Sequence, residues 1–124
     1  MEYYYCEICG NFVSSGCDCV EFVCCNQPMK KVEANTDDSA SKEKHVPVYM
    51  VEGNKVCVKV GETLHPSEDK HYIEWITLIT NKGNYTKKLT SKDKPEVCFN
   101  LDDNEKVEEV LAYCNIHGLW KTNG

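Results

Sequence analysis

The stretch Tyr72–Thr80, with the sequence YIEWITLIT, is rich in β-branched and aromatic residues. Such residues pack well on the pleated surface of a β-sheet. Successive side chains of a strand point to opposite faces, so apolar residues at both odd and even positions indicate a strand that is buried on both sides. The stretch therefore predicts a central strand of a sheet, and other segments must supply its neighbours.

Further strands are predicted on both sides of this stretch. Upstream, the turn signal Gly53-Asn54 precedes a segment whose apolar face is formed by Val56, Val58 and Val60. Downstream, a turn at 81–84 leads into a strand at 85–89, and apolar residues alternate again at positions 97, 99 and 101. The segment 107–114 fits either a strand or a short helix. Several short strands with turns between them are typical of a small β-sandwich.

The 124 residues are enough for one domain, or for two if one of them is very small. The composition changes near Glu33, where a Cys- and Tyr-rich segment ends and the polar stretch ANTDDSASKEK (Ala34–Lys44) begins. This polar stretch is typical of a linker. We therefore expect a small domain at 1–36, a linker at 37–44 and a β-sandwich domain at 45–124.

The charge and the apolar content exclude some functions. The formal net charge is −6, and all 14 basic residues are lysines. Since arginine is the usual residue for forked recognition of phosphates and guanine edges, we expect no nucleic-acid binding. No run approaches the roughly 20 apolar residues that span a bilayer, and the N-terminus MEYYYCEICG lacks the features of a secretory signal. We therefore expect no membrane association and a cytoplasmic location.

Cysteine is strongly enriched, with nine residues in the chain and six of them in the first 25 positions. In a secreted mini-protein this enrichment would suggest disulfides, but in a cytosolic chain clustered thiols more often hold a metal. The odd count also excludes complete pairing within one chain. A segment as short as 1–36 rarely buries enough apolar surface to fold without disulfides, a metal or a partner chain.

Four of the cysteines have the spacing of a tetrahedral metal site: Cys6, Cys9, Cys24 and Cys25. Two thiolates from a tight turn and two from a returning strand complete a sulfur site that suits Zn²⁺ or a single iron. An adjacent Cys-Cys pair is unusual in such a site, because neighbouring side chains strain the tetrahedron. Cys17 and Cys19 are an alternative source of two ligands, and we rank this pair below the other four.

The four histidines of the chain all lie in the predicted sandwich domain: His45, His65, His71 and His117. Imidazole is a common ligand for Fe, Zn, Cu and Ni. A single histidine is more often a structural residue than a ligand, but four in one domain favour a second metal site. The heptapeptide CNIHGLW (114–120) adds a thiol, because Cys114 precedes His117 by three positions.

Three segments closely resemble superoxide reductase: EKHVPV (43–48), HPSEDKHYIEWI (65–76) and YCNIHGLWK (113–121). The N-terminal pattern of Cys-x2-Cys followed by Cys-Cys resembles the desulforedoxin-like domain of the two-iron form of that family, desulfoferrodoxin. The resemblance covers nearly the whole chain in the order of the family. It implies an all-β protein, with a small metal-bound N-terminal domain followed by an immunoglobulin-like β-sandwich.

The resemblance also implies two iron centres. The first is a distorted FeS₄ centre, in which zinc can replace iron on heterologous expression, and its implied ligands are Cys6, Cys9, Cys24 and Cys25. The second has four equatorial imidazoles and one axial thiolate, supplied by His45, His65, His71, His117 and Cys114. In the family the last histidine binds through Nδ1 and the other three bind through Nε2.

The activity implied by the resemblance is the one-electron reduction of superoxide to hydrogen peroxide. Reduced iron offers an open sixth coordination position and donates the electron to superoxide. A small electron donor such as rubredoxin then reduces the iron again. The family places Lys44 beside the open position, where it attracts the anion, and Glu43 as a sixth ligand after turnover. The backbone N–H groups of Ile116 and His117 are expected to donate to the Cys114 sulfur. Tyr113 either covers this sulfur or belongs to the core.

Two other functions compete with this one. A non-catalytic electron carrier or metal store explains the thiolate site but not an open position that faces an anion. A zinc-ribbon interaction module leaves the histidines unused. Since a segment as short as 1–36 folds poorly alone, we also expect a homodimer joined through that domain. The remaining candidates are expected to be core or strand residues without a ligand role: Trp75, Trp120, Cys57 and Cys98.

Overall fold

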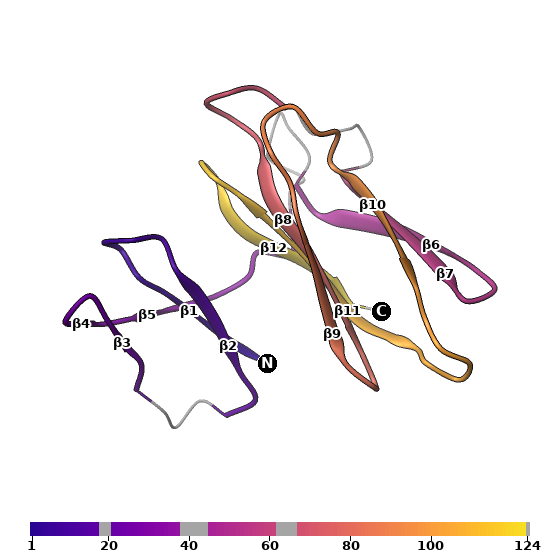
Figure 1. Cartoon of the computed structure of the whole chain (residues 1–124), viewed down its shortest axis with the longest axis horizontal. Coiled ribbons are helices and arrows are strands. Elements are labelled where there is room, and N and C mark those ends of the chain that lie inside the picture. Colours follow the sequence, from indigo (N-terminus) through magenta and orange to yellow (C-terminus); the bar gives the residue numbers. More distant parts are fainter. Residues whose placement is uncertain (18–20, 38–44, 62–66, 124) are drawn as a thin grey trace. The chain divides into compact units, whose positions relative to one another are not determined.

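The computed structural model describes residues 1–17, 21–37, 45–61 and 67–123. Every helix or strand element in these ranges is a β-strand (Figure 1), so the all-β prediction is confirmed. The described ranges contain no helical segment with the length and apolar character of a membrane span. The chain divides into two compact units, Met1–Glu33 and Ala34–Gly124.

The unit Met1–Glu33 contains short strands: β1 (Glu2–Tyr5), β2 (Phe12–Ser15), β3 (Val23–Cys24), β4 (Gln27–Pro28) and β5 (Lys30–Val32). Strand β1 is the centre of a three-stranded antiparallel sheet, with β2 and β5 at its edges. Strands β3 and β4 pair separately as a hairpin. In the described part of this unit, the buried apolar side chains are Tyr3, Tyr4 and Cys6, which is a very small core.

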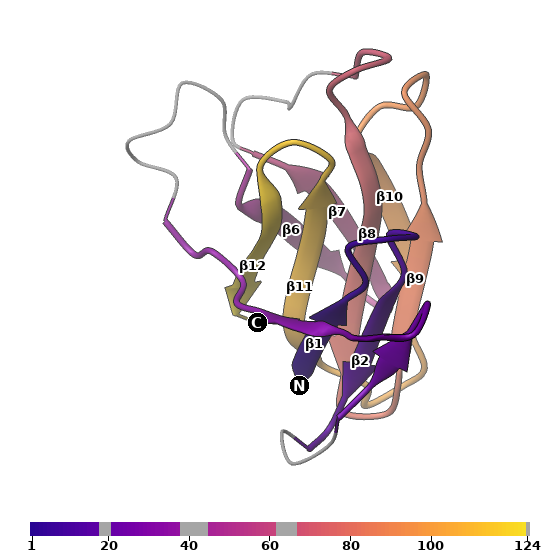
Figure 2. The ribbon, with the colours of Figure 1, turned by 90° about the vertical axis from the view of Figure 1, so that its left-hand side faces the viewer.

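The unit Ala34–Gly124 is a sandwich of two antiparallel sheets, which Figure 2 shows one behind the other. Its strands are β6 (Pro47–Glu52), β7 (Lys55–Val60), β8 (Ile73–Thr80), β9 (Asn84–Lys88), β10 (Glu96–Asn100), β11 (Val107–Cys114) and β12 (Gly118–Asn123). One sheet has the order β10-β7-β6 and the other has the order β12-β11-β8-β9. The predicted β-sandwich is therefore confirmed.

The apolar core of the sandwich contains residues of both sheets. Val56, Val58 and Val60 of β7, which were predicted to share a face, are buried in one cluster with Ile76 and Leu78 of β8. Because strand side chains alternate between the two faces, every second residue of a strand contributes to this cluster. The period of two in the sequence thus marks the inner faces of the sandwich.

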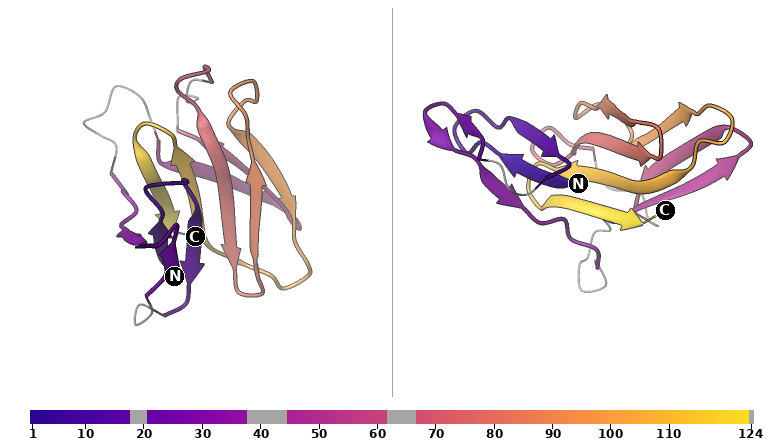
Figure 3. Two further views of the ribbon diagram at one scale, coloured as in Figure 1. Left: turned by 60° about the vertical axis from the view of Figure 1, so that its left-hand side comes forward. Right: turned by 90° about the horizontal axis from the view of Figure 1, so that it is seen from below.

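The central strand predicted from YIEWITLIT is β8, which lies between β11 and β9 (Figure 3). The segment 107–114 is strand β11, so of the two alternatives for this segment the strand is correct. Val110 and Ala112 of this strand belong to the core cluster. The predicted turn at Gly53 is also present, because this residue joins β6 to β7 with a φ of +61°, which glycine adopts without strain.

A buried carboxylate holds the loop between β10 and β11. Glu105 is 8% exposed and accepts hydrogen bonds from the hydroxyls of Thr80 and Tyr85 and from the backbone N–H of Asp102. These donors, the Thr80 hydroxyl first, hold the pKa of Glu105 below its usual value of 4.5. The hydrogen bond to Glu105 raises the pKa of Tyr85. Since the folded pKa of Glu105 is lowered, its stabilising contribution is present above the unfolded pKa and is lost as the pH falls through the folded value.

We expect Glu105→Gln to lower the melting temperature near pH 7 by roughly 5 °C or more, because a neutral amide cannot accept all three hydrogen bonds. The difference from wild type should shrink as the pH falls from about 4.5 through the lowered folded pKa of Glu105, below which the wild-type carboxylate is protonated as well. Thermal denaturation followed by circular dichroism measures both effects. Glu108→Gln, at an exposed position of β11, is the matched control. Equal shifts in the two variants would contradict the role of Glu105.

Candidate metal centres

Four cysteine sulfurs converge in the unit Met1–Glu33. The Sγ atoms of Cys6, Cys9, Cys24 and Cys25 all lie within 4.8 Å of one another. The Sγ of Cys24 lies 3.6 Å from that of Cys9 and 3.9 Å from that of Cys25. A tetrahedral site with metal–sulfur distances of about 2.3 Å places its sulfurs about 3.8 Å apart. The cluster therefore has the dimensions of a tetrahedral thiolate site.

Two turns bring these sulfurs together. In the first, the N–H of Gly10 donates to the carbonyl of Cys6 at 2.9 Å, and Gly10 has a φ of +79°. In the second, Cys25 and Asn26 have φ values of +54° and +62° between the paired strands β3 and β4. A two-residue turn with both residues left-handed matches the twist of a hairpin. This backbone accommodates the adjacent thiols of Cys24 and Cys25 in one cluster, which the sequence alone made unexpected.

Contacts among the four thiols separate their pKa values. The backbone N–H of Cys9 donates to the sulfur of Cys6 and is the main reason why the pKa of Cys6 falls to about 7. The side-chain contact of Cys24 with Cys9 raises the pKa of Cys24. The side-chain contacts of Cys25 with Cys9 and with Cys24 raise the pKa of Cys25 to about 12. Because the thiolate is the metal ligand, Cys24 and Cys25 must lose their protons when a metal binds at neutral pH.

The metal affinity of this cluster is expected to fall by about 100-fold or more for each unit by which the pH is lowered around neutrality, since at least two protons are displaced. A Co²⁺ titration between about pH 6 and pH 8, followed by the Co²⁺–thiolate absorption, measures this dependence. The metal-free Cys114→Ser variant is the appropriate protein, because it removes the thiolate of the second cluster. An affinity that changes by less than about tenfold per pH unit would contradict the raised pKa values.

The second cluster lies at one end of the sandwich. Ile73, the first residue of β8, pairs with Cys114, the last residue of β11, so the segment before β8 lies beside the turn after β11. The heptapeptide CNIHGLW spans the end of β11, the turn and the start of β12. Cys114 pairs with Gly118 across this turn, and Gly118 has a φ of +86°. His45 lies shortly before β6 and His71 shortly before β8.

The described members of this cluster are His45, His71, Cys114 and His117, whose ligand atoms lie within 4.8 Å of one another. Nε2 of His45 faces Nδ1 of His117 at 3.0 Å, and Sγ of Cys114 lies 3.8 Å from the same Nδ1. Two nitrogens that bind one metal at right angles, each at about 2.1 Å, are about 3.0 Å apart. The two imidazoles thus have the spacing of adjacent ligands. His45 and Cys114 are buried and His117 is exposed, so one side of the cluster reaches solvent.

Trp120 belongs to this site, although the sequence suggested only a core aromatic. Its indole ring stacks on the imidazole of His45, with ring centroids 4.8 Å apart. Its indole N–H donates to the carbonyl of His117 at 3.1 Å. Trp120 therefore contacts two of the clustered histidines at once. The position of Trp120 three residues after His117 is the only sequence signal for this role, and such a signal is weak.

Asn115 was also missed by the sequence reasoning. Its side-chain oxygen accepts the backbone N–H of Tyr72 at 2.9 Å, and its amide donates to the carbonyl of Lys70 at 3.0 Å. These two bonds tie the turn after Cys114 to the segment that carries His71. Asparagine is common in turns because its side chain can bond to nearby backbone groups, and this is the signal that the sequence offered.

The structure does not place every predicted site residue. Three of them lie outside the described residues: Glu43, Lys44 and His65. Tyr113 is half-buried and stacks on Trp75, with ring centroids 5.8 Å apart. Ile116 has its side chain exposed in the turn between β11 and β12.

These features define a small all-β metalloprotein with one set of four thiols and one mixed set of imidazoles and a thiol. Thiolates favour zinc and iron, and imidazole suits iron as well. The distances between the donor atoms in both clusters fit ligands that surround a single ion. The donor sets are therefore suitable for two non-haem iron ions.

Comparison with known proteins gives the family. The sequence matches the Desulfoferrodoxin family over residues 37–123. A desulfoferrodoxin of Syntrophotalea carbinolica is 48% identical over 127 residues, which cover 100% of this chain and 97% of that protein. The crystal structure of the superoxide reductase from Treponema pallidum covers 98% of this chain and 96% of its own, with 32% identity and a TM-score of 0.83. The superoxide reductase (1Fe-SOR) from Giardia intestinalis covers 67% of this chain and 98% of its own, with 38% identity and a TM-score of 0.57.

The chain therefore belongs to the desulfoferrodoxin family, and the resemblance seen in the sequence is confirmed. The similarity to the Syntrophotalea protein extends over both units, because it covers the whole chain. The family and the two donor clusters are consistent with two iron centres in the chain.

Proposed function

We propose that this chain is a superoxide reductase, an oxidoreductase that reduces superoxide by one electron and releases hydrogen peroxide. The observation that carries the proposal is the cluster of three histidines and Cys114, which is buried on one side and open to solvent on the other, in a chain of the desulfoferrodoxin family. Similar structures from Treponema pallidum and Giardia intestinalis are superoxide reductases, which supports the same activity here.

In this proposal one iron is held by His45, His65, His71, His117 and Cys114, of which His65 lies outside the described residues. A second iron is held by Cys6, Cys9, Cys24 and Cys25, and zinc can take its place after heterologous expression. When bound in the histidine cluster, iron supplies the electron that superoxide receives. Ligation through Nε2 of His45 and Nδ1 of His117 is supported by the way these two atoms face each other.

The protein has to admit a small anion and two protons and to keep the imidazoles in place. Because His117 is exposed while His45 and Cys114 are buried, superoxide approaches from the side of His117. Trp120 holds His45 and the turn in position through its stacking and its hydrogen bond, so the site is already organised before the anion arrives. In this proposal the backbone N–H groups of Ile116 and His117 would donate to the Cys114 sulfur and spread its negative charge.

In this proposal Lys44 would attract the substrate, and Glu43 would bind the metal after turnover. The net charge of −6 repels an anion, so a cation beside the site has a large effect on its approach.

Lys44→Ala is expected to slow the reaction with superoxide roughly tenfold at low salt, and by less as salt rises, while the iron content stays full. Stopped-flow rates at two ionic strengths measure this effect. Lys106→Ala removes the same charge at an exposed position and is the control; an unchanged rate for Lys44→Ala would remove the steering role.

The partners and the location are finer parts of the proposal. A small electron donor of the rubredoxin type re-reduces the protein in the cytoplasm. The chain forms a homodimer through the unit Met1–Glu33, in which Ile8 is 57% and Val23 is 65% exposed. Apolar side chains at such exposure support a partner surface on a unit with so small a core. Light scattering should give twice the mass of one chain, and a monomeric wild type would overturn the dimer.

Rapid anaerobic mixing of the reduced, iron-loaded protein with superoxide tests the activity, with hydrogen peroxide and oxygen counted as products. One peroxide for each superoxide, without oxygen, is the result expected of a reductase. Half as much peroxide with a matching amount of oxygen would mean a dismutase. No reaction in fully loaded protein would favour a non-catalytic electron carrier.

A further inference from the structure

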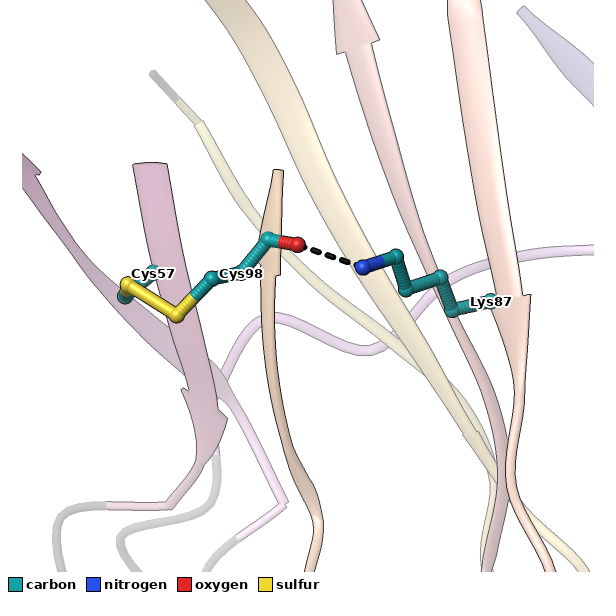
Figure 4. The surroundings of a disulfide bond; sticks show 3 residues. All are labelled: Cys57, Lys87 and Cys98. Atoms are coloured by element: carbon teal, nitrogen blue, oxygen red, sulfur yellow. Dashed lines mark hydrogen bonds between the residues drawn. A yellow bond between two sulfur atoms is a disulfide. The ribbon is translucent and has the colours of Figure 1, made fainter. Parts of the chain in front are cut away.

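A disulfide joins Cys57 of β7 to Cys98 of β10 (Figure 4). The two residues are direct partners in the antiparallel pairing of these strands, with their Cα atoms 4.0 Å apart. The sequence did not predict this bond, because it placed both thiols opposite the apolar faces of their strands without pairing them. Neither cysteine belongs to the clusters described above, whose cysteines are free.

The bond is not needed to bring its two strands together. Strands β7 and β10 pair over five consecutive residues, from Glu96–Lys59 to Asn100–Lys55. On their other face, Val56, Val58 and Phe99 belong to the core cluster. All five free cysteines among the described residues lie in the two metal clusters, which need reduced thiols, and disulfides in a reducing compartment are mostly transient and redox-active. A reversible bond therefore fits this setting better than a permanent one.

Both sulfurs lie where small reagents and a reductant can reach them. Cys98 is exposed, Cys57 is half-buried, and β10 is the edge strand of its sheet. The two cysteines line a groove of about 450 Å³ together with Val48, Met50, Lys59 and Glu96. Attack on a disulfide or a thiol requires this kind of access, and most buried structural disulfides lack it.

Three lysines lie near the pair. Lys55 and Lys59 lie two residues before and after Cys57, and therefore on the same face of β7. The ammonium group of Lys87 donates to the backbone carbonyl of Cys98 at 2.6 Å (Figure 4). Glu96 pairs with Lys59 and offsets part of this charge. Nearby cations favour the thiolate, which is the nucleophilic form of cysteine.

We propose that Cys57 and Cys98 form a reversible dithiol–disulfide pair that reduces hydrogen peroxide. The proposal rests on the proposed function, because superoxide reduction releases peroxide from the same protein chain that carries the cysteine pair. It gives the protein a second reaction, based on sulfur, that consumes the product of the first.

The reaction has two steps. The thiolate of the exposed Cys98 attacks one peroxide oxygen, so that an S–O bond forms, the O–O bond breaks and hydroxide leaves as water after protonation. The thiol of Cys57 then attacks the Cys98 sulfur, so that the S–S bond forms and the S–O bond breaks with release of a second water. Two thiols and one peroxide give one disulfide and two waters, and two electrons pass from sulfur to oxygen. A dithiol reductant returns the pair to its starting state.

The test uses the full, iron-loaded chain. The protein is treated anaerobically with dithiothreitol, freed of it, exposed to one equivalent of hydrogen peroxide, alkylated and digested, and the peptides carrying Cys57 and Cys98 are analysed by mass spectrometry. We expect both thiols to be alkylated before peroxide is added and to be joined again afterwards. A disulfide that survives dithiothreitol in the folded protein, or thiols that stay alkylatable after peroxide, would overturn the proposal.

Single variants assign the roles of the two sulfurs. In Cys57→Ser, peroxide should leave Cys98 as a sulfenic acid that dimedone labels. In Cys98→Ser, the oxidation of Cys57 should be at least about tenfold slower, because this sulfur is half-buried. Equal labelling of the two variants would overturn the assignment of Cys98 as the attacking thiol. Iron content measured in each sample shows that both variants are folded.

A second arm separates this proposal from the superoxide reductase activity. Superoxide replaces peroxide, with and without catalase. If added peroxide oxidises the two thiols to a disulfide but superoxide does not, the proposed superoxide reductase function is wrong and the proposal for the cysteine pair is supported. If superoxide yields free peroxide and both thiols remain reduced, the proposal for the cysteine pair is wrong and the superoxide reductase activity is supported.

Discussion

Replacing Cys114 with serine is expected to lower the rate of superoxide reduction by more than about 100-fold, because removal of groups that merely support a metal ligand already costs about 10- to 100-fold. Cys114 is fully buried at the end of β11 and provides the sulfur of the histidine cluster. A serine hydroxyl at this position is a poorer donor for iron than a thiolate. Stopped-flow consumption of superoxide, together with iron analysis, measures the loss.

A second variant keeps this prediction independent of folding. Cys114→Ser buries a hydroxyl in the apolar core, which costs about 1–3 kcal/mol if the group finds no partner. Cys114→Ala removes the thiolate without burying a polar group, and it should lose as much activity. The double variant Cys57→Ser/Cys98→Ser removes two sulfurs from the same unit and should retain superoxide reduction. Full activity of Cys114→Ala would contradict the role of the thiolate.

Replacing Cys6 with serine is expected to unfold the unit Met1–Glu33 and to leave the sandwich intact. The described buried apolar side chains of this unit are Tyr3, Tyr4 and Cys6, and domains of fewer than about 40 residues usually need a metal or disulfides to fold. A structural metal contributes roughly 10–16 kcal/mol to folding in comparable small sites. Hydrogen exchange of β1 and β2 should therefore accelerate by at least about 1000-fold, while that of β8 and β11 stays unchanged.

A neighbouring residue supplies the control for this variant. Glu7 lies between the first two cysteines and forms an exposed salt bridge with Lys30 at 3.0 Å. Exposed ion pairs contribute about 1 kcal/mol or less, so Glu7→Gln should leave hydrogen exchange almost unchanged. If the strands of the Cys6→Ser variant keep their protection, the metal is not what holds this unit together.

The strands and the ligand spacings could be predicted because they depend on local patterns. A run of β-branched and aromatic residues identified β8, alternation with a period of two identified the inner face of β7, and a glycine marked the turn between β6 and β7. The heptapeptide CNIHGLW carries Cys114 and His117 on one hairpin, so its two donors are close whatever the rest of the fold is. Each of these signals depends only on residues that are close together in the sequence.

The remaining features depend on contacts between distant positions. The sequence placed Cys57 and Cys98 on the outer faces of their strands, but their bond requires the register of β7 against β10, across a separation of 41 residues. The stacking of Trp120 on His45 requires that the first half of β12 lie beside the start of β6. The left-handed backbone of Cys25, which lets adjacent thiols share one site, is held by the pairing of β3 with β4. No local pattern contains this information.

The most direct test of superoxide reduction at the histidine cluster compares three reduced, iron-loaded proteins in one stopped-flow experiment: wild type, Cys6→Ser and Cys114→Ser. Each protein is mixed with superoxide, and the rate of superoxide consumption and the peroxide formed are recorded. We predict that wild type and Cys6→Ser react at similar rates and give one peroxide for each superoxide, whereas Cys114→Ser falls to the level of the protein-free control. Loss of the reaction in Cys6→Ser with full activity in Cys114→Ser would place the chemistry at the other centre and contradict the proposed function of the histidine cluster.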